Sequence, residues 1–165
     1  MPVHKKTATL ALLVRDGHLL LGKRIRKNTE IGELTLNGPG GKVEKGQTLE
    51  ESLIEEVEKE VGITVAASRL ADGKVGVITF YTGARSVWVV HVYLVTEFSG
   101  EPQDSEEMRA FGGVWWYPID QLPFDLMLAS DPIWIPRALS GKRFCAEVFQ
   151  SSDGKYLYDF RVTSA

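Results

Sequence analysis

Short runs of apolar and β-branched residues, separated by turn-forming residues, recur along the chain and predict a protein rich in strands. Asp16-Gly17, between the first two runs, is a two-residue turn signal and predicts a β-hairpin. The long fourth run is rich in Val, Trp and Tyr, so we expect it to lie centrally in a sheet. Residues 28–41 and 99–109 are polar and predict loops. The predicted strands cover residues 7–15, 18–24, 75–81, 87–98, 114–119, 143–150 and 155–162.

The apolar repeat lengthens to four residues over 48–61 and predicts the clearest helix of the chain. Thr48 and Glu51 have the spacing of a capping box, in which each side chain bonds to the backbone N–H of the other residue. Gly62 follows, as is typical of a helix end. The apolar stripe of this helix consists of Leu49, Leu53, Val57 and Val61.

A second helix is predicted from Ser130-Asp131-Pro132 onward, where a cap and a first-turn proline stand together, and Gly141 would end it. Many strands with two helices at irregular positions predict an α+β fold, in which helices cover a mixed sheet. The 165 residues suffice for one well-buried domain and are too few for two ordinary ones. We therefore expect a single domain over residues 1–165.

The composition is that of a folded protein, with 44% hydrophobic and 25% charged residues. A net charge of −3 argues against polymeric nucleic acid as a partner, because such a partner calls for a basic surface. This charge is compatible with a small anionic ligand, since a bound divalent cation can supply the positive charge.

Cys145 is the only cysteine, so we expect no internal disulfide and a reducing compartment. Residues 1–6 run into the first strand without a secretory signal, and no apolar run approaches the roughly 20 residues that span a membrane. These patterns predict a cytoplasmic protein that does not insert into membranes.

A glycine-rich loop feeds directly into the first helix, where Glu56 and Glu60 stand four residues apart and so share one face. Like charges at this spacing repel, and a hard divalent cation bridging both carboxylates and substrate phosphates would remove that cost. Paired glutamates on a helix are more often solvated surface charges, and we prefer that interpretation for Glu50, Glu51 and Glu58. The adjoining loop changes the judgement for Glu56 and Glu60.

The spacing of this loop and helix resembles the signature of the Nudix family. That signature reads Gly, five residues, Glu, seven residues, then Arg-Glu-apolar-any-Glu-Glu-any-Gly-apolar. The matching residues are Gly41, Glu56, Val57, Glu60, Gly62 and Ile63. The departures are Gln47, Glu55 and Lys59, which stand where the family usually has Glu, Arg and Glu.

The resemblance extends to the oxidised-purine nucleoside triphosphatases (8-oxo-dGTP diphosphatases) of that MutT-like family, and it covers nearly the whole chain. Residues 37–43 are similar to the loop before their signature, and residues 107–109 to a segment with an additional acidic residue near the metals. Residues 120–124 are similar to part of their C-terminal region, together with Met127, Trp134 and Pro136.

This resemblance implies an α/β/α sandwich in which the signature forms a loop–helix–loop. It implies a Mg²⁺-dependent hydrolase, with Mn²⁺ as an alternative ion, which splits a nucleoside triphosphate or another nucleoside diphosphate-linked substrate into a monophosphate and pyrophosphate. Possible oligomeric states are a monomer and a homodimer.

The resemblance also assigns roles. Glu56 and Glu60 would be catalytic residues and metal ligands, with Glu56 or a metal-bound water as the candidate for the general-base step. The Gly41 carbonyl and Glu107 would be further metal ligands. Three cations are candidates for phosphate contacts, although each could equally be a solvated surface charge: Lys23, Arg24 and Lys42.

Lys59 removes one ligand and adds a positive charge, because a protonated ammonium has no acceptor for a metal. Gln47 and Glu55 change together, which leaves no single charge unpaired. Glu55 and Lys59 now have the favourable spacing of a helical ion pair. Two functional classes follow: a working hydrolase with fewer metal ligands, or a nucleotide-binding module without the reaction. The two carboxylates, the loop glycines and Glu107 favour the enzyme.

In the oxidised-purine enzymes an aromatic side chain stacks on the base and two aspartates read its edge, opposite an asparagine. This chain places Leu128, Ser130 and Asp131 at the first three positions and Asn37 at the fourth. Asp131 has an equally good structural interpretation as a helix cap before Pro132. Because apolar contacts discriminate weakly between ligands, we expect a less selective base pocket or a different preferred substrate.

Overall fold

The structure of the protein is a computed structural model and describes residues 4–25, 34–83, 86–103 and 113–163. Its two α-helices, within the described residues, are α1 (Leu49–Val61) and α3 (Asp131–Leu139). The strands of the large sheet are β1 (His4–Arg15), β2 (His18–Ile25), β3 (Leu34–Asn37), β4 (Gly40–Lys42), β6 (Lys74–Thr82), β7 (Ser86–Val95), β9 (Val114–Pro118), β10 (Phe144–Gln150) and β11 (Leu157–Thr163). A second, two-stranded sheet consists of β5 (Thr64–Val65) and β8 (Phe98–Ser99).

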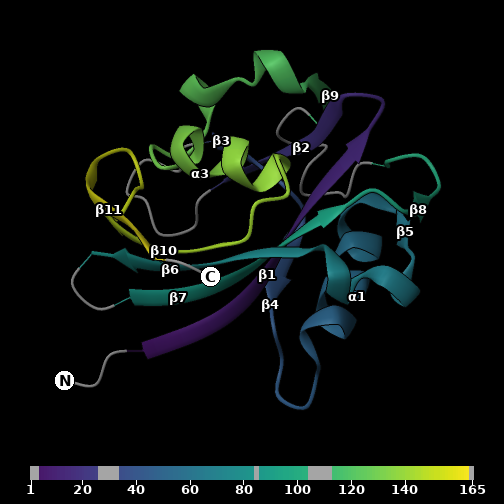
Figure 1. Cartoon of the computed structure of the whole chain (residues 1–165), viewed down its shortest axis with the longest axis horizontal. Coiled ribbons are helices and arrows are strands. Elements are labelled where there is room, and N and C mark those ends of the chain that lie inside the picture. The colour runs from purple at the N-terminus through teal and green to yellow at the C-terminus, as the bar shows by residue number, and fades with distance from the viewer. Residues whose placement is uncertain (1–3, 26–33, 84–85, 104–112, 164–165) are drawn as a thin grey trace.

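The large sheet is mixed and has the order β11-β10-β6-β7-β1-β2-β3, with β4 added to β1 and β9 added to β2 (Figure 1). β1 and β7 are parallel, as are β6 and β10, and the other neighbours are antiparallel. β7 lies between β6 and β1, which confirms its predicted central position. The predicted hairpin is also confirmed, since Asp16 and Gly17 both adopt the positive φ angles of its turn.

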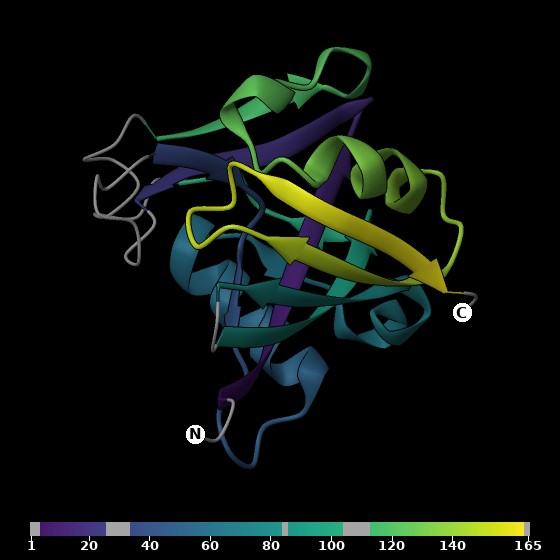
Figure 2. The same ribbon diagram turned by 90° about the vertical axis from the view of Figure 1, so that its left-hand side faces the viewer.

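The sheet separates two hydrophobic cores, which places it between helices as the predicted sandwich requires. One core lies under α3 and includes Trp134, Ile135 and Phe144. The other lies under α1 and includes Leu53, Val57 and Tyr93. Figures 1 and 2 show α3 and α1 on opposite sides of the strands, with the closing hairpin β10–β11 continuing the sheet beside α3.

The ends of α1 follow the sequence prediction. Thr48 accepts the N–H of Glu51, and the Glu51 carboxylate accepts the N–H of Thr48, which is the reciprocal capping box. At the other end Gly62 has φ 70° and donates its N–H to the Glu58 carbonyl. The left-handed conformation at position 62 favours glycine, and it ends the helix there.

Three local predictions were wrong. The segment predicted as a loop over residues 28–41 contains β3 and β4, because pairing with β2 and β1 overrides a low strand propensity. Asp131, the expected cap, is the first residue of α3, and Ser130 at the N-cap position makes no capping hydrogen bond. The Asp131 carboxylate instead accepts the N–H of Leu128, which precedes the helix, at 3.0 Å. The long fourth run ends as a strand at Val95, and Phe98 belongs to β8.

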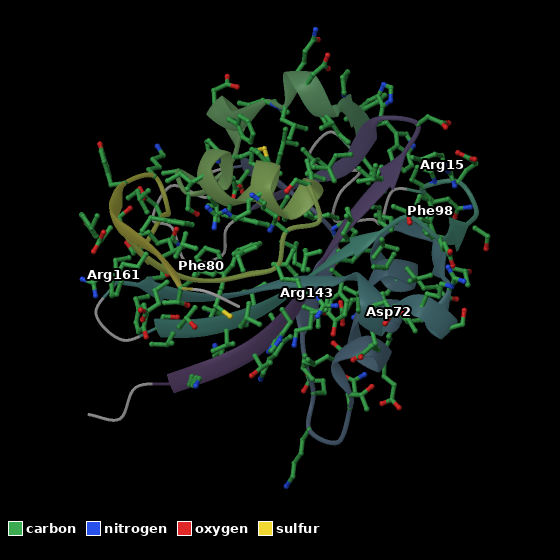
Figure 3. All side chains as sticks on the ribbon, in the orientation of Figure 1. Arg15, Asp72, Phe80, Phe98, Arg143 and Arg161 are labelled. Atoms are coloured by element: carbon green, nitrogen blue, oxygen red, sulfur yellow. The ribbon has the colours of Figure 1, made fainter. Side chains whose placement is uncertain are left out.

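The outer end of the β1–β2 hairpin is attached to β8 by stacking. The Arg15 guanidinium lies 4.7 Å from the ring centre of Phe98 and 5.4 Å from that of Trp116 (Figure 3). Arg15 also donates to the Glu101 carboxylate at 3.0 Å. A cation in contact with two aromatic rings stabilises the position of this hairpin end.

Candidate active site

The glycine-rich segment 38–41 lies against the backbone of β1, and this close approach requires its glycines. Ala11 donates its N–H to the Pro39 carbonyl at 2.8 Å, which ties the loop to the strand. A Cβ atom at Gly40 would overlap with the backbone of Thr9. A larger residue at position 40 would therefore push the loop away from the sheet.

Gly41 and Glu56 meet where this loop passes α1. A Cβ atom at Gly41 would stand 2.7 Å from Cδ and from Oε2 of Glu56, so the missing side chain makes room for the carboxylate. Glu60 lies one turn further along the same helical face. Both glutamates are half-buried, and Oε2 of Glu60 is out of contact with solvent. The structure thus brings Gly41 and Glu56 together and aligns Glu60 with them.

The side chains brought together here are two carboxylates, whose donor atoms are oxygens, and the main chain of Gly41 lies beside Glu56. Hard divalent cations such as Mg²⁺ prefer oxygen ligands, so this donor set fits such a cation. Within the described ranges, no group of three or more His, Cys, Asp or Glu side chains could hold a metal. Glu107, the candidate third carboxylate, lies outside the described residues.

Two of the three departures from the signature, Gln47 and Glu55, have a local explanation. Gln47 donates from Nε2 to Oε2 of Glu55 at 2.6 Å, and its Oε1 accepts the N–H of Glu44 at 3.0 Å. Positions 47 and 55 therefore still bind each other, through a charge-assisted hydrogen bond in place of an ion pair. The expected ion pair of Glu55 with Lys59 is not formed in this part of the structure, where both side chains are exposed.

Glu50 differs from the sequence interpretation, which treated it as a solvated charge. It is half-buried at the start of α1, close enough to Tyr93 and His91 for its charge to act on both. Burial, together with the Glu50 carboxylate, raises the pKa of the Tyr93 hydroxyl above its ordinary value. Glu51 serves in the capping box, and Glu58 is exposed as expected.

A cavity of about 380 Å³ lies on the other side of the glycine loop, between the sheet and α3. Gly41 and Lys42 form part of its wall, so it adjoins the Glu56 carboxylate. Four residues that the sequence proposed for substrate binding line it: Asn37, Lys42, Leu128 and Asp131. For Lys23 and Arg24 the structure gives the backbone pairing of β2, and their side chains lie outside the described residues.

Two of these polar side chains are held in place by local hydrogen bonds. Asn37 accepts the N–H of Gly38 through Oδ1 at 2.9 Å, which leaves its amide N–H groups as donors. Asp131 is 3% exposed, and its Oδ1 accepts the indole N–H of Trp134 at 3.0 Å. With Oδ2 bound to Leu128 N–H, the carboxylate is oriented by two hydrogen bonds.

Ser130 was expected among the base-reading positions, but it is fully buried and is not part of the cavity wall. Sequence reasoning also missed wall residues contributed by the central strands. These are Phe80 and Thr82 on β6, Trp88 on β7 and Gln150 on β10. Figure 3 labels Phe80 among the side chains of this sheet. The alternation of side chains along each strand could have indicated which residues point to the same face of the sheet. The register between the strands, which decides which of them lie side by side, could not be read from the sequence.

The part of the cavity wall formed by the sheet includes two aromatic side chains. Phe80 and Trp88 are direct cross-strand partners, and Lys6 lies with Nζ 5.1 Å from the ring centre of Trp88. Such a wall suits a flat ring, since aromatic faces stack on one another. The arrangement can therefore hold a planar ring next to the segment that contacts Glu56.

Comparison with known proteins agrees with this arrangement. The family model described as the NUDIX domain matches residues 4–138. The chain is 38% identical over 140 residues to the oxidized purine nucleoside triphosphate hydrolase of Danio rerio, covering 84% of this chain and 83% of that protein. The protein of the same name from Mus musculus is 34% identical over 155 residues, covering 93% and 92%.

Solved structures show the same fold. The MutT NUDIX hydrolase of Burkholderia pseudomallei has a TM-score of 0.66 at 32% identity, covering 84% of this chain and 98% of its own. The MutT protein of Bacillus halodurans has a TM-score of 0.74 at 24% identity, covering 95% and 97%. The family model ends before β10, so Gln150 is a wall residue outside the matched region.

Proposed function

The chain belongs to the Nudix family, and from this premise we propose that it is a nucleoside triphosphate pyrophosphohydrolase that depends on a divalent cation. The products would be a nucleoside monophosphate and pyrophosphate. The observation that carries this proposal is the position of β4, whose residues line the cavity on one side and contact the Glu56 carboxylate on the other. A nucleotide with its base in the cavity would extend its phosphates toward Glu56 and Glu60.

Each group in this arrangement has a chemical task. Glu56, Glu60 and the Gly41 carbonyl would hold the cation, which we propose is Mg²⁺, with Mn²⁺ as an alternative. When bound, the cation supplies positive charge that offsets the negative charge of the phosphates. Glu56 would also take the proton of an attacking water, and Lys42 would contact phosphate oxygens.

An oxidised purine nucleoside triphosphate is a candidate substrate, because two relatives are named for that activity. We propose that the chain is one domain over residues 1–165, acts in the cytoplasm as a monomer or homodimer, and does not bind polymeric nucleic acid. Its single cysteine and its net charge of −3 support the location and the ligand class. No helix within the described residues is long and apolar enough to cross a membrane.

A nucleotide-binding module without catalysis is the second candidate, and the exposed Lys59 in place of a carboxylate favours it. The two are separated by incubating the purified chain with dGTP, dATP and 8-oxo-dGTP in Mg²⁺, in Mn²⁺ and in EDTA. We expect cation-dependent release of the monophosphate and pyrophosphate, resolved by anion-exchange chromatography. Binding of the nucleotides without product in either metal would establish the module instead.

A further inference from the structure

Gln150 is the last residue of β10 and one of the most buried polar residues in the structure, with 3% of its surface exposed. Phe144, Ala146 and Val148 of the same strand belong to the core under α3, so alternation directs Gln150 to that face. The cavity wall includes Gln150, which agrees with this direction. A buried carboxamide therefore belongs to the pocket that we assign to the base.

Of the two polar atoms of this carboxamide, only the nitrogen has a hydrogen-bond partner among the described residues. Its Nε2 donates to Oγ1 of Thr82 at 3.0 Å, and Thr82 also lines the cavity. Its Oε1 is out of contact with solvent, and none of the described residues donates a hydrogen bond to it. Buried polar atoms in folded proteins are nearly always hydrogen-bonded, so an acceptor left over at a ligand cavity indicates a donor on the ligand.

We propose that Gln150 is a specificity-determining residue, whose Oε1 accepts a hydrogen bond from an exocyclic amino group of a purine base. This inference rests on the proposed function, since it takes the cavity to be the base site. Oε1 is buried, so a donor reaches it only when neighbouring side chains move aside, and a group that projects from the ring reaches it more readily than a ring nitrogen. The bond to Thr82 fixes the carboxamide plane, and a fixed acceptor discriminates more strongly than a mobile one.

The test measures binding of nucleoside monophosphates in EDTA by titration calorimetry, so it does not require catalysis or a metal. dGMP is compared with dIMP, which lacks the 2-amino group, and dAMP with the monophosphate of purine deoxyriboside, which lacks the 6-amino group. We expect the wild-type protein to bind one amino-bearing ligand at least tenfold more tightly than its partner. In Gln150→Met, which keeps the length and removes the amide, that ratio should fall below threefold.

Thr82→Val is a second variant, which releases the carboxamide without changing Gln150. We expect it to lower the same affinity ratio at least threefold. If circular dichroism shows that Gln150→Met is not folded, this variant provides the test instead. Ser52→Ala is the matched control, because Ser52 has a buried hydroxyl of the same unpartnered kind on α1, across the sheet. It should leave the ratio unchanged.

Two results would overturn the inference. One is wild-type protein that binds both members of each pair equally, and the other is a preference that survives in Gln150→Met and in Thr82→Val. If the wild-type protein shows the base preference in binding but does not hydrolyse nucleoside triphosphates, only the proposed function is contradicted. Absence of binding by every monophosphate would contradict both.

Discussion

At the scale of single residues, the absence of a side chain at Gly41 matters as much as the carboxylate that occupies the space. The Glu56 carboxylate lies only 2.7 Å from the position that a Cβ atom of residue 41 would take, so the loop and the helix fit together at this point. Its partner Glu60 comes from the same helical face, whereas Glu58 points to solvent. The three glutamates therefore differ in environment although they are neighbours in sequence.

We predict that Glu56→Gln and Glu60→Gln each lower kcat/KM by roughly 100-fold or more, because each removes a charged oxygen ligand of the proposed cation. Glu58→Gln is the matched control, and we expect it to change kcat/KM less than about twofold, as for a solvated charge. Steady-state release of pyrophosphate measures all three. Normal hydrolysis by folded Glu56→Gln or Glu60→Gln protein would contradict the site assignment.

At the scale of elements, α1 shows which features can be predicted from sequence. Its capping box, its glycine end and its apolar stripe depend on residues within one or two turns, so the sequence predicted them correctly. β3 and β4 depend on pairing with distant strands, and their own residues, such as Gly40 and Gly41, do not favour a strand. Only the fold provides those partners.

The candidate site divides in the same way. The Gly41–Glu56 contact was predictable in outline, since a spaced signature connects loop and helix. The wall residues Thr82, Trp88 and Gln150 were not, because their position depends on the register of three strands and on where α3 packs. The exclusion of Ser130 from the wall follows from the turn geometry at the start of α3.

The same helix carries a prediction about Lys59. Lys59→Glu should tighten Mg²⁺ binding and raise turnover, because it replaces a positive charge beside Glu60 with a possible oxygen ligand. The matched control Lys142→Glu changes the net charge equally at an exposed position outside the site. Calorimetric titration with Mg²⁺ measures the affinity of each protein. If Mg²⁺ affinity increases equally in both variants, the change in net charge explains the effect and no new ligand is needed.

Positions 47 and 55 couple to this change, since they bind each other on the same segment. Metal affinity should therefore also be measured in the triple variant Lys59→Glu, Glu55→Arg, Gln47→Glu. Unchanged or weaker affinity there would assign Lys59 a role of its own, such as a phosphate contact.

At the scale of the whole molecule, the cavity is assembled from both ends of the chain. β1, the glycine loop, two central strands, β10 and α3 all contribute to its wall. Its selectivity is therefore a property of how the layers pack. Leu128 offers this cavity an apolar side chain, and Ser130 is turned out of it, so Asp131 is the remaining acidic residue of the expected set.

For this reason we predict a kcat/KM preference for 8-oxo-dGTP over dGTP below about tenfold, which corresponds to about 1.4 kcal/mol. The proposed amino-group contact of Gln150 would not add to this preference, because both nucleotides carry the same 2-amino group. Competition between the two substrates in one reaction gives the ratio directly. A much larger preference would mean that another part of the wall recognises the oxidised ring.

Stability should depend on pH through His91 of β7. Burial lowers the pKa of His91 below its ordinary 6.5, Lys74 adds to the effect and Glu50 opposes it. Below pH 6.5 the unfolded chain therefore binds more protons at this residue than the folded chain. We predict that the free energy of unfolding falls as the pH drops below 6.5, and that His91→Gln makes this fall shallower. Urea titrations between pH 5 and pH 7.5 measure it, and an identical slope in both proteins would contradict the prediction.

The parallel pairing of β1 with β7 determines when the central part of the sheet can form during folding. His4 pairs with Ser86 and Leu13 with Val95, so β1 pairs with a strand that is synthesised much later. The β1–β2 hairpin and α1 need only nearby residues and can form early, but closing so long a loop is entropically costly and slow. During synthesis, the apolar residues of β1 therefore lack their central partner until β7 has left the ribosome, which makes this interval the stage most exposed to aggregation.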